Sequence, residues 1–149
     1  MATELEERFA IYAFNAGLLV IKLFVVAFST GVVRGSKKVV LNEEDSKRKG
    51  MEMSTEEHPA VARVKRAHLN DLENIPAFLI ISLVWIHTIP DIVECHVLMW
   101  LFTTARFVHT AVYAYYPVPQ PARGICFIVG VLITLYMIVR NFIYFAQFF

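Results

Sequence analysis

One face of the second apolar stretch carries a cation, an amide and a carboxylate. Residues 63–74 read R-V-K-R-A-H-L-N-D-L-E-N and run directly into the apolar segment I-P-A-F-L-I-I-S-L-V-W. Arg66, Asn70 and Glu73 are spaced i, i+4, i+7, which places them in one row on a helix. Ionisable groups at membrane depth are costly, so they normally face a protein interior or a cavity and serve a function. This row suits a small zwitterionic ligand.

A second polar row lies in the third apolar stretch. Arg106, His109 and Tyr113 are spaced i, i+3, i+7, so they also share one helical face. Both rows fall in the same half of their helices, and the two faces can therefore meet at one depth. The alternative is structural, with Arg106 paired to Asp71 or Glu73 in a salt bridge that holds the helices together.

Arg123 follows the proline-rich segment P-V-P-Q-P at residues 117–121. This segment predicts a stiff loop whose last proline suits the first position of a helix. Arg123 then lies in the first helical turn, where a cation is unfavourable because the helix dipole already makes that end positive. A bound anion, such as a thiolate, would explain the arrangement. The alternative is an arginine that extends to lipid phosphates.

Four segments are suited to position these rows as membrane helices. A span of roughly 30 Å of hydrocarbon takes about 20 helical residues. The 149-residue chain is 57% hydrophobic and 18% charged, too apolar for an ordinary soluble domain, and its net charge of +1 gives no indication of a nucleic acid partner. We predict one all-α integral membrane domain, an up-down four-helix bundle. The predicted spans are residues 9–34, 63–89, 92–116 and 121–148.

The charged connector at residues 35–62 predicts the orientation. Nine of the 14 lysines and arginines lie from Arg34 to Arg66, whereas the turn near Pro90 and the C-terminal tail carry none. The positive-inside rule therefore places the connector in the cytosol, with both termini on the lumenal side. Five aromatic residues near the predicted span ends are expected at the membrane interface: Tyr12, Trp85, Tyr115, Tyr116 and Tyr144.

Two further cations and two cysteines need an explanation. Lys22 falls near mid-membrane in the first span and must be paired, for which Asp71 is the candidate. Arg34, at the cytosolic end of that span, reaches either the polar rows or lipid phosphate. Cys95 and Cys126 lie in different predicted helices without a partner at zinc-type spacing, so we expect reduced thiols and no metal site.

In combination, four pieces of the sequence resemble the membrane-associated eicosanoid and glutathione metabolism family. They are V-I-K-L at 20–23, N-E-E-D at 42–45, R-V-K-R-A-H-L-N-D-L-E-N at 63–74, and A-R-F-V-H-T-A-V-Y at 105–113 with P-V-P-Q-P-A-R at 117–123. The resemblance implies a homotrimer in the endoplasmic reticulum membrane that binds glutathione between subunits near the cytosolic face. It places Arg123 beside the sulfur. The implied glutathione shell is Arg34, Arg66, Asn70, Glu73, His109 and Tyr113, with Asp45 and Arg106 as further candidates.

The chemistry of glutathione fits these residue types. Its two carboxylates suit arginines, and its ammonium group suits Glu73. A free thiol with a pKa near 8.5 is only about a few per cent thiolate at pH 7, and a fixed guanidinium such as Arg123 would lower that pKa.

Three positions distinguish the arms of this family. Prostaglandin E synthases carry serine, tyrosine and arginine where this chain has Gly124, Phe127 and Leu69, whereas R-A-H-L-N-D-L-E-N is similar to the microsomal glutathione transferase arm. The resemblance therefore implies a transferase that conjugates glutathione to lipophilic electrophiles and reduces lipid hydroperoxides. A glutathione-dependent prostaglandin E synthase is the alternative, and a non-catalytic lipid-binding protein is the second alternative.

Overall fold

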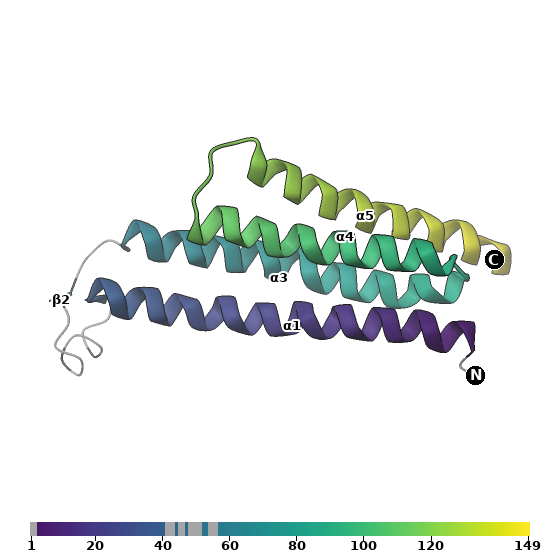
Figure 1. Ribbon diagram of the computed structural model, residues 1–149, viewed down its shortest axis with the longest axis horizontal. Helices are drawn as coiled ribbons and strands as arrows, with labels where there is room; N and C mark the ends of the chain where they lie inside the picture. Colours follow the sequence, from purple (N-terminus) through teal and green to yellow (C-terminus); the bar gives the residue numbers. More distant parts are fainter. Residues whose placement is uncertain (1–2, 41–43, 45–46, 48–51, 54–56) are drawn as a thin grey trace.

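Four long helices form the fold within the residues that the computed structural model describes, which are 3–40, 44, 47, 52–53 and 57–149. Figure 1 shows them running lengthwise through the molecule, with the end of the first helix and the start of the second at the same end. Their bounds are α1 Glu4–Lys37, α3 Pro59–Trp85, α4 Ile92–Thr110 and α5 Ala122–Phe145. Single turns extend three of them, as η1 Ile86–Thr88, η2 Ala111–Tyr115 and η3 Ala146–Phe148. The predicted all-α four-helix fold is confirmed.

The first helix extends beyond its apolar segment at both ends. Thr3 caps it with a capping box, in which Thr3 Oγ1 accepts from the Glu6 backbone N–H at 3.3 Å and Glu6 Oε2 accepts from the Thr3 N–H at 2.6 Å. The helix ends where Lys38 adopts the left-handed conformation with φ 53°. Hydropathy therefore marks the part of α1 that meets lipid, whereas its caps set its actual length.

Two prolines mark the starts of α3 and α5. α3 begins at Pro59, before the predicted start near Arg63, because proline lacks the N–H that the first helical turn leaves unpaired. Pro121, predicted as the first helical residue, is instead the cap of α5, and its carbonyl accepts from Ile125 N–H at 3.0 Å. Arg123 still lies in the first turn of that helix.

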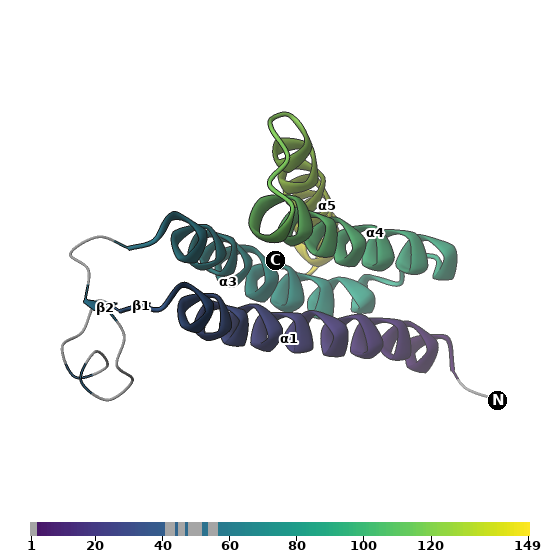
Figure 2. The ribbon, with the colours of Figure 1, turned by 60° about the vertical axis from the view of Figure 1, so that its left-hand side comes forward.

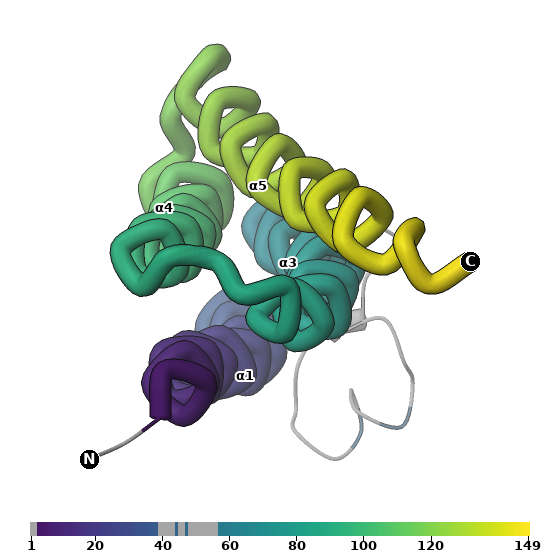
Figure 3. The backbone as a smooth tube through the Cα atoms, turned by 90° about the vertical axis from the view of Figure 1, so that its right-hand side faces the viewer, coloured from purple at the N-terminus to yellow at the C-terminus, as the bar shows by residue number. Residues whose placement is uncertain are grey.

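The chain direction alternates from helix to helix, so that both termini lie at the end opposite the connector (Figure 1). α1 packs against both α3 and α4, and α5 packs against the same two helices. Figure 2 shows α1, α3 and α4 side by side with α5 inclined across them, and Figure 3 shows the same arrangement end-on. Within the connector, β1 Val39–Val40 pairs in parallel with β2 Glu52–Met53, a two-residue ladder too short to be read from the sequence.

Aromatic and aliphatic side chains fill the bundle interior. Phe78 of α3 stacks on Phe102 of α4 with ring centroids 3.6 Å apart, and both are fully buried. Trp85 belongs to the same buried cluster and has 0% exposure, so the predicted interfacial position of its indole is wrong. The residue is near the end of its span, but it faces inward among residues such as Ile11 and Cys95.

The outer faces are apolar and exposed, as a membrane protein requires. Phe28 on α1 and Phe142 on α5 are 74% and 72% exposed. Three helical segments in the described part of the chain are long and apolar enough to cross a membrane: Glu4–Lys37, Pro59–Thr88 and Ala122–Phe148. α4 is not among them because it carries Glu94, Arg106 and two histidines, but it packs between α1 and α5 in the same bundle.

Candidate functional site

A pocket of about 260 Å³ lies where the loop after η2 enters α5. Four residues predicted for the site line it, and they come from α3, α4, η2 and α5: Asn70, His109, Tyr113 and Arg123. Asn70 of the first predicted row and His109 and Tyr113 of the second therefore meet in one pocket. Gln120, Gly124 and Phe127 complete the lining.

Arg123 has unused donor capacity in this pocket. Its guanidinium carbon lies 5.1 Å from the centroid of the Tyr113 ring, a cation–π contact that orients the side chain. Among the described residues, no atom accepts a hydrogen bond from its buried Nε. A guanidinium offers only donors, so this half-buried arginine can hold a hydrogen-bond acceptor, and an anionic acceptor forms the strongest contact with it.

Tyr113 connects the arginines of the site. Its hydroxyl accepts from Arg66 Nε at 3.3 Å, and its ring stacks on His109 with centroids 5.6 Å apart. Tyr113 lies in η2, where the last turn of α4 widens to a π-helix, a distortion that often marks functional sites. The sequence predicts a regular helix here, because a one-turn widening leaves the apolar pattern intact.

Arg106 lies beneath the pocket in a buried cluster. Its Nη2 donates to Asp71 Oδ1 at 2.6 Å and to Asn70 Oδ1 at 2.6 Å. Asp71 also forms an ion pair with Lys22, so both the predicted Lys22 pairing and the structural alternative for Arg106 are confirmed. Thr110, which the sequence analysis missed, donates to Asp71 at 3.0 Å.

Arg66 and Arg106 contact residues of this pocket without lining it, and three further predicted residues lie away from it or outside the described residues. Arg34 Nη2 lies 3.6 Å from Glu57 Oε1, in an ion pair between the end of α1 and the residue near the start of α3. Glu73 is exposed on α3. Asp45 lies outside the described residues. The roles predicted for these residues remain predictions.

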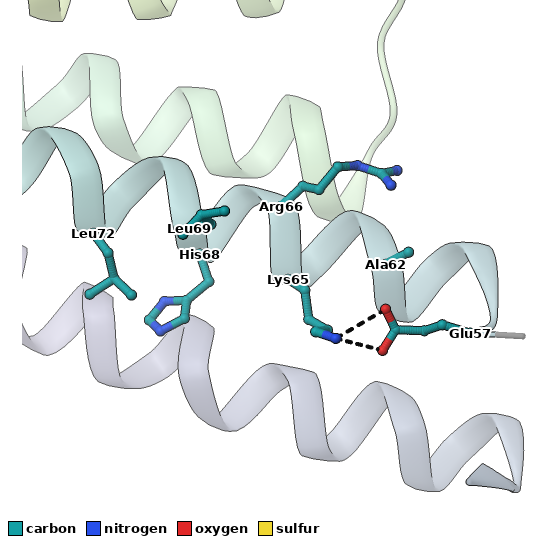
Figure 4. Close-up of a pocket in the computed structure, with 7 residues that line it drawn as sticks. All are labelled: Glu57, Ala62, Lys65, Arg66, His68, Leu69 and Leu72. Carbon is teal, nitrogen blue, oxygen red and sulfur yellow. Dashed lines mark hydrogen bonds and ion pairs between the residues drawn. The ribbon is translucent and has the colours of Figure 1, made fainter. Parts of the chain in front are cut away.

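The outward face of α3 carries a second, open pocket of about 420 Å³. Figure 4 shows Lys65 turned toward Glu57, which it contacts at 2.9 Å, whereas Arg66 extends away from that pair. Leu69 is 57% exposed on this surface. Arg66 lines this outer pocket and donates to the hydroxyl of Tyr113, which lines the first pocket, so a hydrogen bond joins the two.

Comparison with known proteins places the chain. A model of the MAPEG family matches residues 12–143. The chain belongs to the MAPEG family. The resemblance drawn from its motifs is thereby confirmed.

Two kinds of relative share most of the sequence. Microsomal glutathione S-transferase 1 of Sus scrofa is 38% identical over 138 residues, covering 90% of this chain and 88% of the relative. The human protein of that name is 37% identical over 139 residues, covering 91% and 89%. Prostaglandin E synthase of Bos taurus is 40% identical over 98 residues, covering 66% and 64%.

Proposed function

We propose that this protein is a membrane glutathione transferase that conjugates glutathione to lipophilic electrophiles. The observation that carries the proposal is Arg123, a half-buried arginine with an unpartnered Nε, lining a pocket with Asn70, His109 and Tyr113. The two transferase relatives named above, which cover 90% and 91% of this chain, support the same activity.

Arg123 would hold glutathione as its thiolate. A free thiol of pKa near 8.5 is about a few per cent ionised at pH 7, and a fixed guanidinium beside the sulfur lowers that pKa. The thiolate attacks the electrophilic carbon, a carbon–sulfur bond forms, and the leaving group departs with its electron pair while the thiol proton goes to solvent. Electrophiles dissolved in the bilayer approach from the apolar helix faces.

The remaining shell would bind the ends of glutathione. Arg66 and Asn70 offer donors to its carboxylates, and Glu73 offers an acceptor to its ammonium group. Arg34 and Glu73 lie outside the pocket of a single chain, which supports a site shared with a neighbouring copy in a homotrimer. We place this trimer in the endoplasmic reticulum membrane, with the connector cytosolic and the termini lumenal.

Reduction of lipid hydroperoxides follows from the same thiolate. It attacks the terminal peroxide oxygen, the oxygen–oxygen bond breaks, and the lipid leaves as an alcohol. A second glutathione then displaces water and forms glutathione disulfide. Two thiols are oxidised for each peroxide reduced, so disulfide formation coupled to hydroperoxide loss measures this activity.

The experiment that tests the proposal is conjugation of chlorodinitrobenzene by the purified protein, compared with Arg123→Ala and Arg140→Ala. Arg140 is the matched control, because it lies on the same helix but pairs with Glu94. We expect Arg123→Ala to lower kcat by about a hundredfold or more, with a smaller effect on glutathione affinity, and Arg140→Ala to leave both unchanged. Equal losses of kcat and affinity would contradict the role of Arg123.

Prostaglandin isomerisation is the second candidate, and the 40% identity to prostaglandin E synthase favours it. Against it, two of the positions that differ from that arm, Gly124 and Phe127, line the pocket. A wild-type protein that binds glutathione but does not conjugate it, and that isomerises the prostaglandin precursor, would replace the transferase with this function. If the wild-type protein does not bind glutathione, the non-catalytic lipid-binding protein is the function that remains.

A further inference from the structure

The amide of Asn70 has a defined orientation. Its Oδ1 lies 2.6 Å from Arg106 Nη2. A guanidinium has no acceptor, so the amide atom facing Arg106 must be the carbonyl oxygen. The NH₂ group of Asn70 then points away from Arg106, and no described residue accepts a hydrogen bond from it. Because Asn70 lines the pocket, this arm is available to a ligand.

Arg106, which contacts the Asn70 amide, is held by residues from three helices. Arg106 and Asp71 have 0% exposed side chains, and they are joined at 2.6 Å. The second oxygen of Asp71 accepts hydrogen bonds from Lys22 of α1 and Thr110 of α4. Movement of the Arg106 guanidinium would break these buried contacts, and they therefore hold it in position beneath Asn70.

The cluster also carries an excess of positive charge. Lys22 and Arg106 contribute two cations and Asp71 contributes one carboxylate, all buried. In addition, Nε and Nη1 of Arg106 are buried without a partner among the described residues. The field at Asn70 therefore favours a negatively charged group.

We propose that Arg106 and Asp71 are positioning residues that fix the Asn70 amide with its NH₂ group toward the pocket, so that Asn70 selects a carboxylate of the ligand. The inference rests on the proposed function, because that carboxylate is one of the two in glutathione. Asp71 acts through Arg106, and Arg106 acts through Asn70.

Two substitutions of Asn70 test its orientation. Asn70→Ala removes the donor and is expected to weaken glutathione binding about tenfold, the value of one hydrogen bond to a charged group. In Asn70→Asp, Arg106 holds one oxygen and the other faces the pocket, so we expect a loss of about a hundredfold through like-charge repulsion. Binding by Asn70→Asp equal to or tighter than that of Asn70→Ala would overturn the proposal. Both variants keep the contacts of Asp71 with Lys22, Arg106 and Thr110.

A double-mutant cycle tests the positioning role. Arg106→Gln is expected to weaken glutathione binding about tenfold when Asn70 is present, and at most about twofold in the Asn70→Ala background. Effects of the lost charge that do not pass through Asn70 appear in both backgrounds and cancel. Arg140→Gln, a change of the same type at an arginine paired with Glu94, should not alter binding.

The readouts are the dissociation constant of glutathione by calorimetry, kcat, and the unfolding midpoint in detergent. If Arg106 has a purely structural role, Arg106→Gln will reduce glutathione affinity equally with and without Asn70, and this additivity would overturn the inference. The proposed function would still stand in that case if the wild-type protein conjugates glutathione. Absence of glutathione binding by the wild-type protein would overturn both.

Discussion

Asp71→Asn should destabilise the fold far more than removal of Lys22, the cation paired with it. Removing one partner of a buried ion pair costs about 3–5 kcal/mol, because a charge is left uncompensated. Asp71 is fully buried and neutralises two cations, Lys22 and Arg106. Asp71→Asn leaves both cations without a counter-charge. We therefore expect it to lower the free energy of unfolding by about 5 kcal/mol, the upper end of that range.

Lys22→Met should have a much smaller effect on stability. Asp71 keeps its ion pair with Arg106, and the cluster of two cations and one carboxylate becomes neutral. Lys22→Met therefore removes only the hydrogen bonds of Lys22, and we expect it to lower the free energy of unfolding by about 1–2 kcal/mol. In the Lys22→Met background only one cation is stranded by Asp71→Asn, so its cost should fall to about 3 kcal/mol.

The assay is unfolding by sodium dodecyl sulfate in mixed micelles, followed by circular dichroism, for the wild-type protein, both single variants and the double variant. Thr134→Val is a suitable control, since within the described residues the Thr134 hydroxyl donates only to the Gly130 carbonyl on its own helix. If Lys22→Met proved as destabilising as Asp71→Asn, or if the two losses were additive, Asp71 would not be the centre of the cluster.

Two other substitutions give separate outcomes. Glu73→Gln should raise KM for glutathione about tenfold while kcat stays unchanged, because an exposed carboxylate would bind only the ammonium group; steady-state kinetics with varied glutathione checks this, and an unchanged KM would exclude the role. Trp85→Ala should lower the free energy of unfolding by about 3–5 kcal/mol, as expected for a fully buried aromatic side chain. The same detergent titration measures this change. A loss below 1 kcal/mol, roughly the limit for an exposed site, would indicate that the indole lies at the membrane interface.

Much of the helical framework was predictable from local sequence. Four apolar segments interrupted by prolines and charges indicate four helices, because intrahelical hydrogen bonds and transfer from water act on each segment separately. The spacing of Arg66, Asn70, His109 and Tyr113 defined two polar rows without knowledge of the fold. Lys22 and Asp71 could be paired in advance, because a buried cation needs a carboxylate and few carboxylates lie at its depth.

Positions that depend on contacts between helices were harder to predict. Trp85 was expected at the interface from its distance along the span, but distance along a helix does not say which side of it a residue faces. Arg106 had two candidate carboxylates, and only the packing of α3 against α4 and η2 selected Asp71 over Glu73. The widened turn at η2 and the short β1–β2 ladder carry no periodic signal.

The sequence by itself determined that this is a helical membrane protein of the MAPEG family with polar rows on two of its helices. These properties arise from residue types and their spacing along single helices. The tertiary structure decided that Asn70, Tyr113 and Arg123 share one pocket, that Arg34 and Glu73 lie outside it, and that Asp71 neutralises two cations. Such outcomes depend on how helices rotate and approach one another, because a buried charge takes whichever partner the packing brings within reach.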